Sequence, residues 1–233
     1  MSEPVCIVTG VGPGTGRAIA ERFANEGYQV AMLARRADRL AEYAESNPAL
    51  HPVPCDVSDE AAVKDAIAKI NKDFGNAEVL VHNAVGGAWG DFLSIEPHVL
   101  EDNFRVNTMG LLYLAQAVSP AMIAAGTGAI MVTGNTAATR GRPNYAGFAP
   151  TKAAQRILAE SMARTLGPKG IHVAYLIIDA VIDLAWTRKR NPEAPDSYFA
   201  KPSAIADVVW KTVDQDPSTW SFLVEMRPFG ETW

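Results

Sequence analysis

The chain has 233 residues, a formal net charge of −5, 48% hydrophobic residues and 20% charged residues. This composition suits a compact domain with a substantial core and excludes disordered and collagen-like proteins. The acidic balance gives no electrostatic reason to expect a nucleic acid or an anionic membrane as partner. We therefore expect a small-molecule ligand.

The start of the chain, residues 1–4, lacks the basic and apolar stretches of a secretory signal. No apolar run approaches the roughly 20 residues that cross a bilayer, so a cytoplasmic protein is expected. Cys6 and Cys55, the only cysteines, have neither CxxC spacing nor a neighbouring histidine cluster. We expect two buried free thiols, with no disulfide and no metal site.

Short β-branched or apolar segments alternate along the chain with longer segments of helical period. The expected strands are Val5 to Thr9, Val30 to Ala34, Val53 to Cys55, Val79 to His82, Ala129 to Thr133, His172 to Ile178 and a strand-like Ser221 to Met226. The expected helices are Arg17 to Asn25, Ala61 to Lys72, Val99 to Ala125 and Ala153 to Leu166. The alternation predicts an α/β fold, a Rossmann-type doubly wound parallel sheet of about seven strands with helices on both faces. Residues 1–233 are expected to form one domain that binds ligands at the carboxyl ends of its strands.

Residues 183–202 interrupt this pattern with a polar stretch that contains three prolines and Arg188-Lys189-Arg190. Two interpretations stay open. The segment is a solvated surface loop, or it is a lid that closes over a cofactor and substrate.

A glycine-rich segment, Thr9-Gly10-Val11-Gly12-Pro13-Gly14-Thr15-Gly16, follows the first expected strand and precedes a helix. Glycines let the backbone approach a pyrophosphate, and the helix directs its free N–H groups and positive dipole end at the same place. We therefore place Gly10, Gly14, Thr15 and Gly16 at a dinucleotide phosphate. The alternative is a purely structural turn.

The spacing Thr-Gly-x-x-x-Gly-x-Gly resembles that of the short-chain dehydrogenase/reductase family, and the resemblance extends from Val5 to about Ile178. It implies that Asp56 and Val57 contact the adenine ring. It also implies that Asn83, in His82-Asn83-Ala84-Val85, orders the backbone where the family usually has Asn-Asn-Ala-Gly. Val181 and Ile182 stand near the usual Pro-Gly, where their backbone can serve the nicotinamide carboxamide.

The choice of cofactor depends on Arg35 and Arg36, which end the second expected strand where NAD-binding folds usually have an acidic residue. A guanidinium can pair with the 2′-phosphate of NADP(H) that a carboxylate would repel. NADP(H) is therefore favoured over NAD(H). The alternative is that both arginines only solvate the next helix.

The family resemblance implies four catalytic positions: an asparagine, a serine, and a tyrosine and a lysine one helical turn apart. In that family the tyrosine transfers a proton to or from the substrate oxygen, the lysine holds the nicotinamide ribose, and the asparagine supports a proton-relay water. Asn107 and Lys152 match the asparagine and the lysine, whereas Asn135 and Phe148 stand at the serine and tyrosine positions. An asparagine amide can donate a hydrogen bond, but a phenylalanine ring cannot donate a proton.

Tyr145 is the nearest replacement proton donor in the sequence. Six residues separate it from Lys152, a spacing that resembles the enoyl-thioester reductases of the same superfamily. The sequence thus predicts an NADPH-dependent reductase that transfers hydride to a carbonyl or an activated C=C bond of a small organic substrate. The alternatives are that Tyr145 is a surface aromatic, and that the protein is a catalytically weak or inactive NADP(H)-binding protein with a sensing or scaffolding role.

Aromatic residues are concentrated near the carboxyl terminus: Trp210, Trp220, Phe222, Phe229 and Trp233. The family resemblance implies a homodimer or homotetramer. The alternative is that these rings only close the core of the monomer.

Overall fold

The computed structural model describes residues 3–230, and its centre is a parallel sheet of seven strands in the order β3-β2-β1-β4-β5-β6-β9. The strands are β1 (Val5–Thr9), β2 (Gln29–Ala34), β3 (Leu50–Pro54), β4 (Ala77–His82), β5 (Gly128–Gly134), β6 (Ile171–Ile178) and β9 (Leu223–Met226). Every residue of β1 and of β6 is buried, as expected for parallel strands that are covered on both faces. The predicted doubly wound α/β fold is confirmed.

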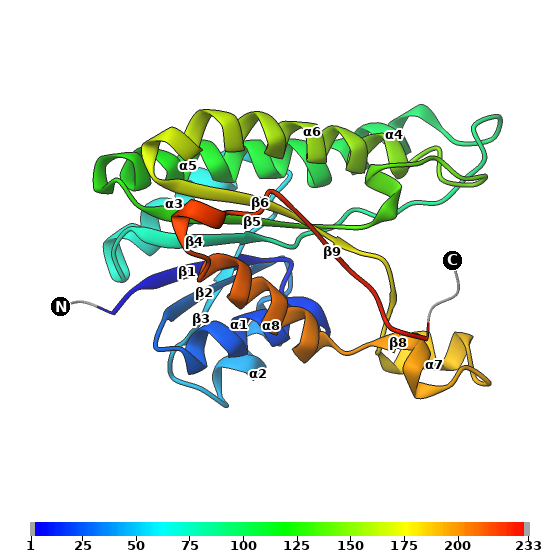
Figure 1. The fold of residues 1–233 in the computed structure, drawn as a ribbon, viewed down its shortest axis with the longest axis horizontal. Helices are drawn as coiled ribbons and strands as arrows, with labels where there is room; N and C mark the ends of the chain where they lie inside the picture. Colours follow the sequence, from blue (N-terminus) through cyan, green and yellow to red (C-terminus); the bar gives the residue numbers. More distant parts are fainter. Residues whose placement is uncertain (1–2, 231–233) are drawn as a thin grey trace.

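Helices cover both faces of the sheet (Figure 1). One layer contains α3 (Glu60–Asp73), α5 (Gly110–Ala125) and α6 (Ala149–Leu166), and the other contains α1 (Thr15–Asn25), α2 (Ala37–Ala44) and α8 (Pro202–Val213). The core is split accordingly, because alternate strand residues point to opposite faces. Ile7 belongs to the cluster on the first face and Val8 to the cluster on the second.

The direction of winding reverses at β1, whose two neighbours are β2 and β4. In open sheets of this kind a crevice forms at such a point, outside the carboxyl ends of the strands. The glycine segment follows β1, and Asn83 follows β4 directly. The topology therefore brings both to the same crevice.

Several element boundaries differ from the sequence expectations. β3 begins at Leu50 rather than Val53 and contains Pro52. This strand lies at the edge of the sheet, where a proline disrupts no second ladder of hydrogen bonds. α2 was expected only as a helix after Arg36, without bounds, and α8 was not predicted.

The helix expected from Val99 to Ala125 begins at Pro97 and has three parts. α4 (Pro97–Phe104) leads into a π-helical turn (Arg105–Met109), and α5 follows without a break. A π-helical turn is rare and often occurs at functional sites. This one contains Asn107.

The continuous helical stretch from Pro97 to Ala125 is long and apolar enough to cross a membrane, by length and composition alone. No such segment was expected from the sequence. A single helix of this kind is weak evidence for a membrane span, because the core helices of soluble proteins meet the same criteria. Leu111, Leu114 and Val118 of this helix belong to the buried core on the first face of the sheet.

Residues 183–202 are more structured than a plain loop. They contain α7 (Ala185–Arg190) and end in β8 (Phe199–Ala200), which pairs with β7 (Val181–Ile182). Arg188 holds the segment together, because its Nε and Nη2 donate to the two carboxylate oxygens of Asp183 at 2.7 and 2.8 Å, and its Nη1 donates to Asp196 at 2.6 Å.

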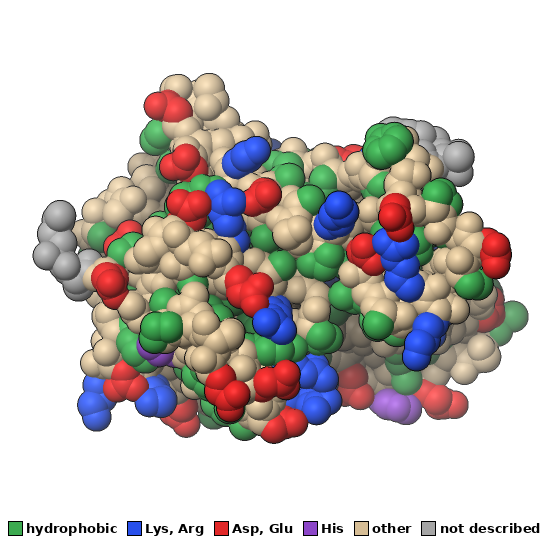
Figure 2. Space-filling view, turned by 90° about the horizontal axis from the view of Figure 1, so that it is seen from below, with side chains coloured by type: hydrophobic (Ala, Val, Ile, Leu, Met, Phe, Trp, Pro, Cys, Tyr) green, Lys and Arg blue, Asp and Glu red, His purple; other side chains and the backbone are tan. Residues whose placement is uncertain are grey.

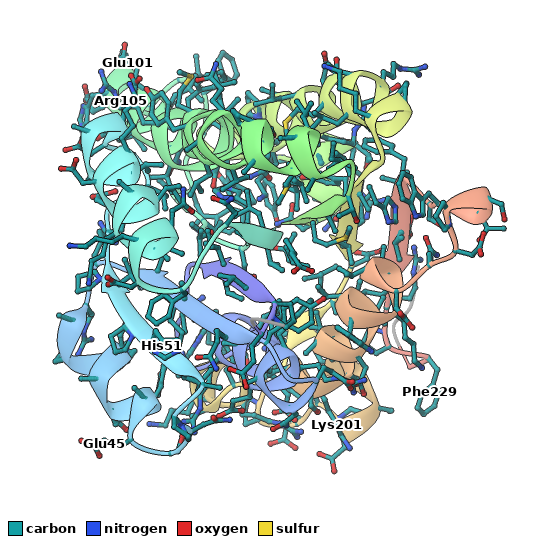
Figure 3. All side chains as sticks on the ribbon, turned by 90° about the vertical axis from the view of Figure 1, so that its left-hand side faces the viewer. Glu45, His51, Glu101, Arg105, Lys201 and Phe229 are labelled. Carbon is teal, nitrogen blue, oxygen red and sulfur yellow. The ribbon has the colours of Figure 1, made fainter. Side chains whose placement is uncertain are left out.

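The aromatic residues of the tail have different environments. Trp210 packs edge-on against Phe23 at 5.3 Å between ring centroids, and Trp220 stacks on His172 at 4.8 Å. Phe229, in contrast, is 94% exposed and projects from the body of the molecule (Figure 3). Trp210 therefore packs against the monomer's own core, whereas Trp220 covers His172, and Trp233 lies outside the described residues.

The face that carries α1, α2 and α8 is shown in Figure 2. Lys and Arg side chains alternate there with Asp and Glu side chains, and no patch of one sign covers the face. Pairs within one helix account for part of this mixture, such as Arg17 with Glu21 and Arg22 with Glu26. Exposed pairs of this kind contribute little to stability.

The turn before β6 gives a test of the backbone geometry. Gly170 has a φ of +82°, and a Cβ there would lie 2.2 Å from the carbonyl oxygen of Gly126. We predict that Gly170→Ala lowers the free energy of unfolding by about 2 kcal/mol or more, because a non-glycine residue is strained at this φ. Gly167→Ala is the matched control, since Gly167 has helical dihedrals and open space around its Cβ position. Urea unfolding measures both, and equal midpoints for the two variants would contradict the prediction.

Candidate functional site

A cavity of about 670 Å³ lies at the carboxyl ends of β1, β2 and β4. Most of the residues that we expected at a cofactor line it: Gly10, Gly14, Thr15, Gly16, Arg35, Arg36, Asp56, Val57, Asn83 and Ile182. Val181 and Lys152 are not part of the lining. Ten positions that are distant in the sequence thus share one cleft.

The glycine segment is a close-packed backbone cradle. Gly10 has a φ of +67°, and a Cβ there would lie 2.5 Å from the Cα of Ala84. A Cβ at Gly16 would lie 2.5 Å from the carbonyl oxygen of Gly10. Side chains at these positions would force the backbone apart. α1 begins directly after Gly14, which provides no side-chain cap, so the helix presents an uncapped N-terminus to the cleft.

Thr15 provides an independent sign of a ligand. Its Oγ1 is buried and has no hydrogen-bond partner. Buried polar groups are nearly always satisfied, and a hydroxyl can donate one hydrogen bond and accept others. An anionic oxygen in the cleft would supply the missing acceptor. The uncapped helix, the glycine cradle and this hydroxyl together fit the pyrophosphate of a dinucleotide.

Three arginines also line the cleft: Arg35, Arg36 and Arg39. Arg36 pairs with Asp38 at 3.1 Å, but both side chains are more than 60% exposed, and such a pair is weak. Sequence reasoning missed Arg39, which lies in α2, a helix that was expected after Arg36 without bounds. The charge of these three side chains favours an anionic group.

Asp56 and Asn83 order the walls of the cleft. One oxygen of Asp56 accepts hydrogen bonds from the backbone N–H of Ser58 at 3.0 Å and from its hydroxyl at 2.7 Å. Asn83 Nδ2 donates to the carbonyl of Gly10 at 3.1 Å, and its Oδ1 accepts from Thr133 Oγ1 at 3.0 Å. Asn83 thereby ties together the ends of β1, β4 and β5.

Asn107 is completely buried in the π-helical turn. Its Oδ1 accepts from the N–H of Gly86, and its Nδ2 donates to the carbonyl of Gly86 and to Thr151 Oγ1, each at 2.9 Å. Both N–H groups of the amide are used within the protein. The side chain therefore fixes the segment after β4 against α6 and has no donor left for the relay water that the resemblance implied.

Lys152 projects from α6 into the interior and is 2% exposed. Its ammonium donates to the carbonyl of Thr133 at 3.2 Å and to Gln155 Oε1 at 2.6 Å, and no carboxylate pairs with it among residues 3–230. Burial lowers the pKa of this amine to about 7. Lys152 is thus held at the end of β5 with its charged and neutral forms balanced near neutral pH.

Phe148 is buried, at 3% exposure, in an aromatic cluster with Tyr145 and Trp89. The Trp89 ring lies 5.0 Å from Phe148 and 4.5 Å from Tyr145 between centroids. Tyr145 lines a second cavity of about 580 Å³, which shares no lining residue with the cofactor cleft. Phe148 lines neither cavity, and within the described chain no hydrogen bond joins Tyr145 to Lys152.

Asn135 lies between β5 and a short 3₁₀ turn, Thr136–Ala138. Its Oδ1 accepts from the N–H of Ala137 at 3.1 Å and caps this turn. The amide nitrogen contacts no acceptor within the described range, so a donor remains for a substrate oxygen.

Besides Arg39, sequence reasoning missed Gln155 and Tyr175. Gln155 is completely buried and lies three residues after Lys152, on the same face of α6. Tyr175 is completely buried on β6, and its hydroxyl donates toward Gln155 Oε1 at 3.3 Å. The spacing of Gln155 was the available signal. Tyr175 carried none, because its strand reads as uniformly apolar.

The fold and the cleft define a dinucleotide-binding α/β protein. The family described as short chain dehydrogenase matches residues 4–192. D-erythrulose reductase of Gallus gallus is 34% identical over 168 residues, which span 72% of this chain and 67% of that protein. L-xylulose reductase of Mus musculus is 31% identical over the same shares. An alcohol dehydrogenase from the archaeon Thermococcus sibiricus, solved in complex with 5-hydroxy-NADP, is 25% identical with a TM-score of 0.86 and covers 98% of both chains.

The chain therefore belongs to the short-chain dehydrogenase family, whose members are oxidoreductases that bind a nicotinamide cofactor. The resemblance read from the glycine segment is confirmed.

The buried hydroxyl of Thr15 gives a test of the cleft. We predict that Thr15→Val leaves the thermal stability of the cofactor-free protein nearly unchanged, because the hydroxyl has no partner to lose. The same change should weaken NADPH binding by about tenfold, the effect of one lost hydrogen bond to a charged group. NADPH fluorescence titration measures the affinity, with Thr165→Val on the outer part of α6 as control. An unchanged affinity for Thr15→Val would show that this hydroxyl does not contact the cofactor.

Proposed function

We propose that the protein is an NADPH-dependent reductase that transfers hydride to a carbonyl or an activated C=C bond of a small organic molecule. The observation that carries the proposal is the cofactor cleft itself, with an unsatisfied Thr15 hydroxyl at its phosphate cradle. The two curated relatives described above are both named as reductases of ketoses, which supports carbonyl reduction.

The preference for NADP(H) is supported by charge. Arg35, Arg36 and Arg39 line the cleft, and no carboxylate takes the position at the end of β2. The carboxylate of Asp38 is paired with Arg36. A 2′-phosphate would therefore meet guanidinium groups that can bind it bidentately.

In this proposal each residue of the site has a separate role in cofactor binding or in reduction. The bound cofactor supplies the hydride. Lys152 holds the nicotinamide ribose, the amide nitrogen of Asn135 donates to the substrate oxygen, and the backbone of Ile182 serves the carboxamide. Tyr145 supplies the proton, since it is the half-buried phenol of this region, whereas Tyr175 is completely buried. General acid catalysis of this kind contributes about 10²- to 10⁴-fold to the rate.

A second candidate function is NADP(H) binding without efficient turnover, in a sensing or scaffolding role. It is favoured by the aromatic cluster, because the buried Phe148 ring packs against Trp89 and Tyr145. It is also favoured by the cavity that Tyr145 lines, which is separate from the cofactor cleft. Both functions need the same cofactor site, and turnover distinguishes them. We further propose a cytoplasmic homodimer or homotetramer that has no nucleic-acid or membrane partner.

Replacement of the two arginines after β2 tests the cofactor preference. We predict that Arg35→Ser combined with Arg36→Ser raises the dissociation constant of NADPH by about 10- to 100-fold, since each charged hydrogen bond contributes about 1.5–3 kcal/mol and Arg39 remains. NADH affinity should change less than about twofold, because NADH has no 2′-phosphate. Fluorescence titration with both nucleotides measures this. Equal losses for NADPH and NADH would contradict a 2′-phosphate site.

Stopped-flow NADPH oxidation with ketoses, other ketones and enoyl thioesters tests the reductase function. Where turnover is found, Tyr145→Phe should lower kcat by about 10²-fold or more if its hydroxyl supplies the proton. Tyr113→Phe, in α5, is the control. Turnover that survives Tyr145→Phe would place the proton donor elsewhere. NADPH binding without turnover of any substrate would favour the sensing role.

A further inference from the structure

We propose that Gln155 is a positioning residue that fixes the Lys152 ammonium at the cofactor site and keeps it protonated by linking it to the backbone of the π-helical turn. The inference rests on the proposed function only in that the ammonium's target is the cofactor ribose. The link itself is a property of the free protein and can be measured without cofactor or turnover.

The amide of Gln155 connects two elements. Its Oε1 accepts from Lys152 Nζ at 2.6 Å, and its Nε2 donates to the backbone carbonyl of Asn107 at 2.6 Å. The carbonyl belongs to the π-helical turn, whereas both side chains belong to α6. One side chain thus joins the two residues that match the family's asparagine and lysine.

Two further hydrogen bonds complete the arrangement, one made by Lys152 and one accepted by Gln155. Lys152 Nζ also donates to the carbonyl of Thr133, at the end of β5. Tyr175 reaches the same Gln155 oxygen at 3.3 Å from β6. The ammonium has three N–H groups, and two of them are used by fixed acceptors. Since both acceptors are held by separate secondary elements, the direction of the third N–H is fixed as well.

A purely structural glutamine would not need this placement. Burying an amide is costly unless it is hydrogen-bonded, and an apolar residue of similar length would fill the same space in α6 without that cost. Gln155 is completely buried, and its oxygen has two donors while its nitrogen has a carbonyl acceptor. The polar contacts point specifically at the Lys152 amine.

The charge of Lys152 depends on these neutral oxygens, because within residues 3–230 no carboxylate pairs with it. The titratable and charged groups around it are His82 on β4, Tyr175 on β6 and Arg156 on α6. Burial and the nearby Lys152 charge lower the pKa of His82 to about 3, and burial raises the pKa of Tyr175, so both are neutral at pH 7. Arg156 donates to the carbonyl of Ala138 and pairs with Glu160 at 3.6 Å. Removal of the Gln155 oxygen would therefore favour the neutral amine.

The Gln155 side chain determines the direction in which the pKa of Lys152 changes. A hydrogen-bond acceptor stabilises the protonated amine, so Gln155→Leu should lower the pKa of Lys152 and Gln155→Glu, which adds a negative charge, should raise it. NADPH binding that depends on the ammonium should weaken as pH rises through the pKa of Lys152. The loss should therefore begin at lower pH in Gln155→Leu and at higher pH in Gln155→Glu.

The experiment uses the full chain with ¹³C-labelled lysine side chains, and NMR follows the titration of each lysine without cofactor. Lys152→Met identifies the Lys152 signal. We expect the Lys152 midpoint to fall by about one pH unit in Gln155→Leu and to rise by at least as much in Gln155→Glu. Gln116→Leu and Gln116→Glu, at an exposed glutamine of α5, are the matched controls and should leave the midpoint unchanged.

The second readout is the pH dependence of NADPH binding to the same variants. We expect Gln155→Leu to weaken NADPH binding at pH 7 by about tenfold, as the loss of the ammonium's fixed hydrogen bond predicts. Unchanged Lys152 midpoints in folded Gln155 variants would overturn the proposal. If Gln155→Leu does not fold, the Gln155→Glu midpoint decides alone. A shifted Lys152 midpoint in a protein that turns over no substrate would contradict the reductase proposal but would support the role of Gln155.

Discussion

The carboxyl edge of the sheet is organised around one buried amine that pairs with no carboxylate in the described part of the chain. Lys152 lies beneath the end of β5, and the oxygens that accept from it are a backbone carbonyl and the amide of Gln155. Ion pairing in such a place would require a second charge to lose its water, which is costly in a protein interior. Neutral acceptors avoid that cost, but they hold the ammonium only while each remains in position. The segments that carry these acceptors must therefore be rigid.

That rigidity comes from two asparagines. Asn83 ties the end of β4 to the glycine segment and to Thr133, whose carbonyl is an acceptor of Lys152. Asn107 uses its whole amide to hold Gly86 and Thr151, and its backbone carbonyl holds Gln155. The cofactor cleft and the lysine are thus parts of one hydrogen-bonded framework. A substitution of either asparagine should therefore disturb both the cofactor cleft and the position of Lys152.

Sequence patterns predicted the parts of this framework that depend on periodicity and on glycine. The buried strands read as apolar runs, and the glycine segment was recognisable because strand, turn and helix follow in order. Patterns gave α2 no bounds and missed α8, and they missed Arg39 on α2. They also missed Gln155 and Tyr175, because a buried polar residue is recognised only by its partners, and these come from distant strands and turns. Tyr145 shows a different limit: its spacing from Lys152 predicted a replacement proton donor, but a spacing cannot specify that the ring packs against Trp89 beside a separate cavity.

The segment from residue 183 to residue 202 is held by a different kind of force from the sheet beside it. Leu184 approaches the glycine cradle, within 3.0 Å of the Cβ position of Gly14, but the segment's own cohesion comes from Arg188 and its two carboxylates. Arg188 also lies over the ring of Phe199 at 4.1 Å. Charges that remain partly in water are screened by salt, whereas apolar burial is not. Ionic strength should therefore weaken the contacts that hold residues 183–202 together more than it weakens the packing of the sheet.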